Sequence, residues 1–243
     1  MAEIDFSIIL LRCDFTPELF ELTKNAANTL RGGEKILIDN ASTIGEIKDW
    51  PDILIKNKTN LGYPAAVNQG FRKAKAKFLV ICNNDIRVSP NWRQIAKEIF
   101  AEDPKIGSVH FKMIPYDEPF DLGYDTWITG KERWCHSSFY VIRREAIPEG
   151  GYFEGYTKGG YDDYDFWHRI RDLNGWKQAY TNCAQFQHKD SSTYQALDER
   201  DHDRDERDQR NRELYKERFG EYPDIQFSTL FPEQMMVNWR PFP

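Results

Sequence analysis

The sequence predicts an α/β fold in which helices flank a mostly parallel, twisted sheet, with a charged helical extension at the C-terminus. Short apolar runs alternate with stretches of helical periodicity, an order typical of parallel sheets with crossover helices. The run from Phe78 to Cys82 is apolar at every position, as expected of a strand that is buried on both faces. Beyond residue 197 the composition changes to closely spaced charges, which predicts the extension.

The first part of the chain alternates strands with a helix. The apolar runs that predict its strands are 5–11, 35–39 and 53–55. Between the first two runs, Thr16 can cap a helix with Pro17 in its first turn, and the glycine pair at 32–33 ends it. Strand, helix and strand in this order predict a parallel pair.

Two further helices are expected around the buried strand. The first lies within 60–70, where Pro64 suits the first turn and Ala66 and Gly70 place two small residues on one face. Small residues let this helix lie close to the sheet or to a ligand. The second helix follows Ser89-Pro90, which we expect to form its N-cap and first turn.

The C-terminal part continues the α/β pattern after a break. Strands are predicted at 106–111, 138–142 and 179–188, with a helix at 162–173 that ends at Gly175. We expect 115–131 to be a long loop, since it is rich in Pro, Gly and aromatic residues. The glycine- and aromatic-rich stretch 150–160 is predicted to be a loop pressed against a ligand.

Charge dominates the segment from Asp198 to Arg218, in which 16 of 21 residues are charged. Acid-before-base pairs at i,i+4 spacing predict an exposed helix or a mobile charged segment. The tail after it is apolar and aromatic again. We therefore expect the C-terminal tail to pack on the body of the protein or on a second copy in a homodimer.

Composition excludes several functional classes. The chain has 243 residues, of which 40% are hydrophobic, enough for one large domain with a sizeable core. Its formal net charge is −6 and it lacks a basic block, so we expect no nucleic acid partner. It shows no transmembrane segment and no basic-then-apolar signal, and we expect a cytoplasmic protein. Its four cysteines are far apart and indicate reduced thiols rather than a disulfide framework or zinc site.

Acidic residues end or follow three of the predicted strands. They are Asp39, Asp85 and the cluster Asp162-Asp163-x-Asp165. The carboxyl ends of parallel strands form the edge where open α/β sheets bind ligands, and carboxylate oxygens suit a hard divalent cation. Each acid also has an ordinary interpretation, because Asp39 and Asp85 could be turn residues and Asp162 could cap its helix.

Over about residues 5 to 220 the chain resembles the inverting glycosyltransferases of family 2, which have the GT-A fold. The motifs that carry the resemblance are Asp39-Asn40-Ala41-Ser42, Asn60-x-Gly62, Asn68-x-Gly70, Asn83-Asn84-Asp85, Gly151-x-Phe153-Glu154, Asp162-Asp163-x-Asp165-x-x-x-Arg169, Asn174-Gly175 and His188-x-x-x-Ser192. The resemblance implies a GT-A-like domain over 1–195, with a nucleotide-binding half at about 1–111 and an acceptor half at about 112–195. The charged helix and apolar tail, 196–243, would pack on it.

The resemblance also implies a reaction and a donor site. The enzyme would move a hexosyl or deoxyhexosyl group from a nucleoside-diphosphate sugar donor to a carbohydrate or other hydroxyl-bearing acceptor. Asp39 would hold the nucleotide base, and the residues expected to line the rest of the nucleotide-sugar pocket are Asn60, Gly62, Asn68, Asn83, Asn84 and Asp85. Asn83 would face the ribose.

Metal and catalytic residues follow from the same resemblance. Asp85, in the family's DxD position, would bind Mn²⁺ or Mg²⁺, with His188 as a second ligand, although a lone histidine at a strand end is also common in cores. Asp163 matches the general base, and the like charge of Asp162 would raise one pKa of the pair. The residues expected to line or support the acceptor side are Trp134, His136, Asp162, Asp165 and Arg169, the last two as an i,i+4 ion pair.

One segment departs from the family. The first strand ends Leu11-Arg12-Cys13, where family members usually have polar residues followed by Asn, so the resemblance assigns no side-chain role there. Two other functions remain open. A sugar nucleotidyltransferase would need a Gly-rich triphosphate loop with Arg and Lys after the first strand, which 11–15 is not. The third is a non-catalytic nucleotide- or carbohydrate-binding module.

Overall fold

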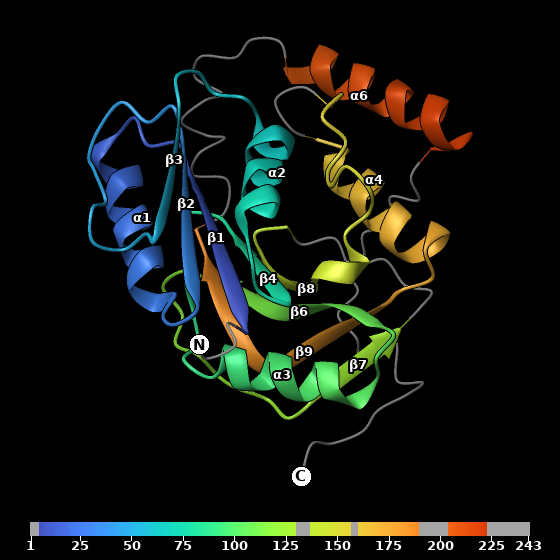
Figure 1. Cartoon of the computed structure of the whole chain (residues 1–243), viewed down its shortest axis with the longest axis horizontal. Coiled ribbons are helices and arrows are strands. Elements are labelled where there is room, and N and C mark those ends of the chain that lie inside the picture. The colour runs from blue at the N-terminus through green and yellow to red at the C-terminus, as the bar shows by residue number, and fades with distance from the viewer. Residues whose placement is uncertain (1–4, 130–136, 157–159, 190–203, 223–243) are drawn as a thin grey trace.

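A computed structural model describes residues 5–129, 137–156, 160–189 and 204–222. Within this part of the chain, a nine-stranded sheet has the order β3-β2-β1-β4-β8-β6-β9-β5, with β7 paired to β9 (Figure 1). The strands are β1 Phe6–Arg12, β2 Glu34–Asn40, β3 Ile53–Asn57, β4 Phe78–Cys82, β5 Ile86–Val88, β6 Ile106–Pro115, β7 Thr126–Thr129, β8 Phe139–Arg143 and β9 Lys177–His188.

The sheet is mostly parallel, as predicted. Strands β1, β2, β3, β4, β6 and β9 run in one direction, whereas β5, β7 and β8 run against it. All seven strands predicted from apolar runs are present. Strand β4 lies in the middle of the sheet between β1 and β8, and all five of its residues are buried.

Helices cover both faces of the sheet. Helices α1 Pro17–Thr29 and α3 Trp92–Glu102 pack on one face, and α2 Tyr63–Lys73 and α4 Asp162–His168 pack on the other. A 3₁₀ turn, η1 Arg144–Ala146, follows β8, and a π-helical turn, η2 Arg169–Leu173, continues α4. None of the described helices combines the length and the apolar character needed to cross a bilayer.

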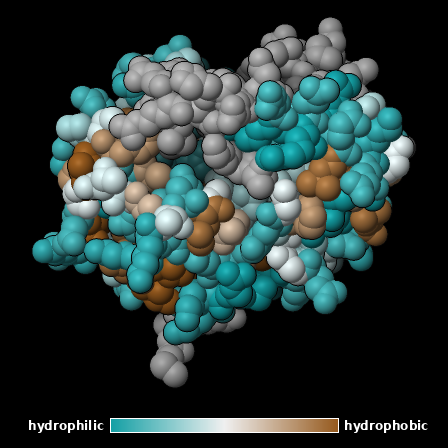
Figure 2. Space-filling model, turned by 90° about the horizontal axis from the view of Figure 1, so that it is seen from above, coloured by the Kyte–Doolittle hydropathy of each residue, from teal (hydrophilic) through white to brown (hydrophobic). Residues whose placement is uncertain are grey.

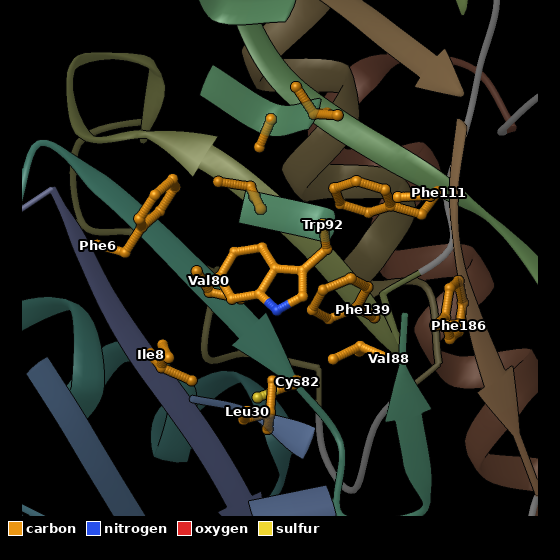
Figure 3. Close-up of a cluster of buried hydrophobic side chains, with 14 of the residues drawn as sticks. Phe6, Ile8, Leu30, Val80, Cys82, Val88, Trp92, Phe111, Phe139 and Phe186 are labelled. Atoms are coloured by element: carbon orange, nitrogen blue, oxygen red, sulfur yellow. The ribbon is translucent and has the colours of Figure 1, made fainter. Parts of the chain in front are cut away.

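The core under α1 and α3 centres on one aromatic side chain. Trp92 is 1% exposed, and its indole meets the rings of Phe6 and Phe139 edge-on, with centroids 5.3 Å and 5.8 Å away (Figure 3). Val80 of β4 and Phe186 of β9 belong to the same cluster. This core therefore joins the strands that the resemblance assigns to the nucleotide-binding and acceptor halves.

The small residues of α2 bring that helix close to the sheet. A Cβ atom on Gly70 would lie 2.6 Å from Cγ2 of Ile9 in β1 and 3.1 Å from Cδ1 of Ile38 in β2. Both isoleucines are fully buried in neighbouring strands. Of the two roles predicted for the small residues of this helix, closeness to the sheet or to a ligand, Gly70 has the first.

We expect Gly70→Ala to destabilise the protein. The methyl group gains about 1 kcal/mol of helix propensity, but overpacking against a buried β-branched side chain costs about 1–3 kcal/mol. Urea unfolding should therefore show a lower free energy of unfolding than for the wild type. Arg72→Ala, at an exposed position of the same helix, is the control and should change stability by less than about 0.5 kcal/mol. An unchanged midpoint for Gly70→Ala would mean that α2 can move away from β1.

Two local predictions are wrong. Helix α3 begins at Trp92 rather than at Ser89-Pro90, because Ser89 Oγ accepts a hydrogen bond of 3.0 Å from the backbone of Gln185 and so holds β9 instead of capping the helix. The segment 115–131 is not all loop. Its residues 126–129 form β7, which pairs antiparallel with β9, a long-range partner that local composition does not reveal.

The charged segment forms a helix. Helix α6 Arg204–Phe219 lies at the top of Figure 1, beside α4. Seen from that side, the surface is mostly hydrophilic and its hydrophobic patches are separate (Figure 2). The apolar tail, with the homodimer predicted through it, lies in 223–243, outside the described residues.

Candidate active site

A chain of buried polar contacts joins the carboxyl ends of β1, β2 and β4. Nε of Arg12, the last residue of β1, lies 3.0 Å from Asp14 Oδ2 and 4.0 Å from Asp39 Oδ2. Asp14 Oδ1 accepts a hydrogen bond of 2.8 Å from the Asn84 amide. The structure thus brings Asp39 and the segment 83–85 to the same edge of the sheet, where open α/β sheets bind ligands.

Sequence reasoning does not single out Arg12 and Asp14. Arg12 is 1% exposed, and its guanidinium donates to Ser42 Oγ and to the carbonyls of Ile44 and Gly45. Asp14 is fully buried, and burial raises the pKa of its carboxyl to about 6, although the Arg12 charge acts in the opposite direction. The available signal was a pair of opposite charges two positions apart directly after an apolar strand.

Asp39, Asn60 and Gly62 lie together beyond the end of β2. Asp39 Oδ1 accepts a hydrogen bond of 2.9 Å from the Ser42 N–H, so this carboxylate does cap the turn. Asn60 Oδ1 accepts hydrogen bonds from the Asn40 amide and from the Gly62 N–H, at 2.8 Å and 2.9 Å. Gly62 has a φ of 81°, which favours glycine, and it precedes α2. Their contact with a nucleotide stays a prediction.

Two other residues predicted for the nucleotide-sugar pocket, Asn68 and Asn84, are hydrogen-bonded to other parts of the protein instead of being open to a ligand. Asn68 is 2% exposed, donates to the Tyr152 carbonyl and to Glu154, and accepts from the Tyr152 N–H, each at 2.8 Å. Asn84 is 5% exposed and donates to Asp14 and to Thr23. These contacts give Asn68 a role in shaping the 151–156 loop and Asn84 a role in fastening segment 83–85 to α1.

Asp85 and His188, the predicted metal ligands, are in contact. Asp85 directly precedes β5, and its neighbour Ile86 pairs with His188 at the end of β9. The Asp85 Oδ1 atom lies 3.2 Å from His188 Nε2, and the two side chains are 5% and 8% exposed. The antiparallel pairing of β5 with β9 is therefore what brings together two residues that are far apart in the sequence.

The Asp85 and His188 side chains suit a divalent ion whose coordination is completed by a bound substrate or solvent. A carboxylate oxygen and an imidazole nitrogen are both acceptable to Mn²⁺, and the carboxylate is acceptable to Mg²⁺. Among the described residues there is no group of three or more His, Cys, Asp or Glu side chains placed to hold a metal. An ion bound by Asp85 and His188 would have further coordination positions, which oxygen ligands such as water or a phosphate group can fill.

A short segment before β8 links this edge to the start of α4. The Asn83 N–H donates to the Ser138 carbonyl at 2.9 Å, and the Tyr63 hydroxyl donates to the Ser137 carbonyl at 3.0 Å. The hydroxyl of Ser137 favours the ionised form of Asp163 and so lowers the pKa of that carboxyl. The segment 137–138 is therefore hydrogen-bonded to the predicted metal side and lies near the predicted general base.

Asp162 and Asp163 form the first turn of α4. The helix is preceded by Tyr161, whose φ of 67° is strained for a residue other than glycine, so Asp162 is not the N-cap. Burial raises the pKa of Asp162 to about 6. Burial and then the Asp162 charge raise the pKa of Asp163 well above its usual range. Asp163 Oδ1 is buried and has no hydrogen-bond partner among the described residues.

Three tyrosines that sequence reasoning missed lie near Asp163. Tyr140 and Tyr152 are 0% and 1% exposed, and their hydroxyls lie 2.9 Å apart. The Tyr63 ring meets the Tyr152 ring edge-on, with centroids 5.5 Å apart. Burial raises the pKa of all three hydroxyls well above the usual range, and the Asp163 charge adds to this. They therefore stay neutral and can donate hydrogen bonds near Asp163.

The predicted ion pair of Asp165 and Arg169 is confirmed, with Nε and Oδ1 2.6 Å apart. Asp165 is fully buried and also accepts from the Tyr156 hydroxyl, while Arg169 donates to the Gly151 carbonyl at 2.7 Å. This pair supports the site rather than facing a ligand. Trp134 and His136, predicted for the acceptor side, lie outside the described residues.

Comparison of sequences identifies one family. The model described as Glycosyl transferase family 2 matches residues 15–169 of the chain. No match was found among curated protein sequences.

Several solved structures have a similar GT-A-like fold. GalNAc-T7 with UDP, GalNAc and Mn²⁺ matches with a TM-score of 0.60 at 13% identity, over 77% of this chain and 44% of that one. S. aureus TarS 1-349 matches with a TM-score of 0.61 at 14% identity, over 96% and 75%. The mannosyltransferase PcManGT from Pyrobaculum calidifontis, with GDP-Man and Mn²⁺, matches with a TM-score of 0.55 at 16% identity, over 77% and 57%. The chain thus spans less than half of the GalNAc-T7 chain, and at these identities the likeness shows the fold alone.

Proposed function

This chain belongs to glycosyl transferase family 2, and from that premise we propose that it moves a sugar from a nucleoside-diphosphate sugar to an acceptor hydroxyl, with inversion and with a divalent metal. One observation carries the proposal. Asp85 and His188 touch at the sheet edge that also holds Asp39, and the segment 137–138 links that edge to Asp163. The donor and base functions of such a reaction require this juxtaposition.

The donor would bind along the edge formed by β1, β2 and β4. Asp39, with Asn60 and Gly62 beside it, would hold the base, and Asn83 would face the ribose. GalNAc-T7, TarS and PcManGT were solved with UDP, UDP-GlcNAc and GDP-Man respectively, which supports a nucleotide donor here. We propose a hexosyl or deoxyhexosyl group as the sugar.

The chemistry divides between the two sides of the site. A Mn²⁺ or Mg²⁺ ion held by Asp85 and His188 would supply positive charge against the leaving nucleoside diphosphate. Asp163 would accept the proton of the acceptor hydroxyl while that oxygen attacks the anomeric carbon. The bond to the diphosphate breaks as the new bond forms, and displacement from the opposite face inverts the anomeric centre. The hydroxyls of Ser137 and Tyr152 stabilise Asp163 in its ionised form.

The nucleotidyltransferase alternative finds no support in the described residues. That activity would need free cationic groups after the first strand to hold a triphosphate. Arg12 is the cation at that place, but it is buried and bonded to Ser42, Ile44 and Gly45. A binding module without activity is the remaining competitor.

A ligand screen followed by a turnover assay tests the proposal. Uridine, guanosine and thymidine diphosphates should raise the melting temperature, more with Mn²⁺ than without it, because a ligand that binds only the native state stabilises it. The corresponding nucleotide sugars should then be hydrolysed slowly in the presence of Mn²⁺. Binding without turnover of any donor would favour the binding module, and an unchanged melting temperature throughout would contradict the donor site itself.

The acid limb of the pH–rate profile should respond to Asp162. Transfer requires ionised Asp163, so the rate falls as the pH is lowered through the apparent pKa of the carboxyl pair. Asp162→Asn removes the negative neighbour, which lowers the Asp163 pKa and should move the acid limb of kcat/KM to lower pH. Asp172→Asn, on the turn after α4, should leave the limb in place. A limb that does not move in Asp162→Asn would mean that another group is the base.

A further inference from the structure

Helix α6 is attached to the body by polar side chains. Arg207, Asn211 and Tyr215 recur at i,i+4 spacing and are 8%, 0% and 1% exposed, whereas most of the helix faces solvent. Figure 1 shows α6 running beside α4, which carries Asp163. Hydrogen bonds, an ion pair and the two aromatic rings of Tyr215 and Phe219 hold this helix, rather than an apolar stripe.

The contacts of α6 lie at both ends of helix α4. The Asn211 amide donates to the Gly160 carbonyl at 3.1 Å, just before α4 begins. The Tyr215 hydroxyl lies 3.1 Å from Nδ1 of His168, the last residue of α4, and the Phe219 ring packs on His168 with centroids 4.3 Å apart. These contacts fix the position of α6 relative to α4.

Arg218 joins α6 to a fully buried carboxylate of α4. Its Nε lies 2.6 Å from Oδ2 of Asp165, a carboxylate with no exposed surface, and its guanidinium lies over the Phe153 ring, 3.5 Å from the centroid. The other Asp165 oxygen binds Arg169, which also holds the Gly151 carbonyl. Arg218 therefore completes a bridge from α6 through α4 to the 151–156 loop.

The charges of this bridge lie close enough to the predicted general base to affect its electrostatic environment. Asp165 belongs to the same first turn as Asp162 and Asp163, and its negative charge contributes to the raised pKa of Asp162. The groups that face Asp163 are Asp162 on α4, Ser137 before β8, Tyr140 on β8, Tyr152 in its loop and Tyr63 on α2. Those that face Asp165 are Arg169, Arg218 and the Tyr156 hydroxyl.

We propose that Arg218 is a positioning residue for sugar transfer, which acts through Asp165 to hold the first turn of α4, and with it Asp163, in the orientation that accepts the acceptor's proton. This inference rests on the proposed function. It assigns a role in the reaction to a charged helix that would otherwise only cover the surface. Arg218 touches neither the donor edge nor the Asp85–His188 pair in the described structure.

Kinetics of three variants test the role. Arg218→Ala should lower kcat by about 10- to 100-fold, because a small displacement of a catalytic group is costly, and should leave KM for the donor within about two-fold. It should also move the acid limb to higher pH, since the loss of one positive charge beside Asp165 favours protonation of the Asp162–Asp163 pair. Arg218→Lys keeps the charge and should restore the limb and most of kcat. Arg210→Ala, an exposed position of α6, is the matched control and should behave as the wild type.

Amide hydrogen exchange gives a second readout that does not need turnover. In Arg218→Ala, exchange should increase in α4 but not in α3, which lies on the other face of the sheet. Exchange in α4 equal to that of the wild type, or an acid limb and kcat unchanged by Arg218→Ala, would overturn the positioning role. A wild-type protein without turnover would instead contradict the transferase function, and the exchange experiment would still decide whether Arg218 holds α4.

Discussion

Asp163→Asn should lower the rate of sugar transfer by about 10²- to 10⁴-fold, the usual contribution of a positioned general base. Asparagine keeps the size of the side chain but cannot take a proton from the acceptor hydroxyl. Because the substitution also removes a carboxyl whose burial is unfavourable to the ionised form, the fold should tolerate it. Nucleoside diphosphate affinity should be unchanged, since the donor edge is built from β1, β2 and β4.

The measurement is a transfer assay combined with calorimetric titration of the diphosphate in the presence of Mn²⁺. Asp172→Asn is the matched control, with the same change of group just beyond α4, and should retain the wild-type rate. A rate within a few-fold of the wild type for Asp163→Asn would remove Asp163 from the role of base. A parallel loss of diphosphate affinity would point instead to a damaged fold.

Asp85→Asn should have the second large effect. Replacing the carboxylate by an amide removes the negative ligand of the proposed ion, and we expect turnover to fall by at least about 10²-fold, as when one preorganised charge-stabilising group is lost. Chelation of divalent ions from the wild type should have the same consequence. The additional rise in melting temperature that Mn²⁺ gives with a nucleoside diphosphate should disappear in the variant.

Asp117→Asn, an exposed change of the same kind on the loop after β6, is the control for Asp85→Asn. It should keep both the Mn²⁺ response and the rate. The metal site at Asp85 and His188 would be refuted by an Asp85→Asn enzyme that responds to Mn²⁺ as the wild type does. A wild type whose turnover survives chelation would show that the transfer needs no divalent ion.

Local patterns predicted much of the fold. The five buried residues of β4 appear in the sequence as an uninterrupted apolar run, because a central parallel strand contacts helices on both faces. The Thr16 side chain accepts from the Leu19 N–H and caps α1, as the sequence Thr16-Pro17 predicted. The start of α3 could not be predicted in this way, because Ser89 Oγ has a long-range partner in Gln185 that outweighs its local capping role.

The candidate site also has residues that the sequence predicted and residues that only the structure reveals. Asp39 and Asp85 stand in recognisable motifs at strand ends and Asp163 in one at the start of a helix, so the sequence and its family resemblance were enough to single them out. The buried pair of Arg12 and Asp14 has no such motif, and its importance appears only when Asn84 and Asp39 are seen to share it. No spacing rule links these positions.

What the sequence by itself determined was the α/β architecture and the acids at its strand ends, because strand burial and helix capping act over a few neighbouring residues. The tertiary structure alone decided which distant side chains meet. It placed His188 against Asp85 through the pairing of β5 with β9, the three tyrosines near Asp163, and Arg218 on Asp165. Such contacts depend on the order of strands in the sheet and on where a late helix packs, and these are properties of the whole chain rather than of any segment.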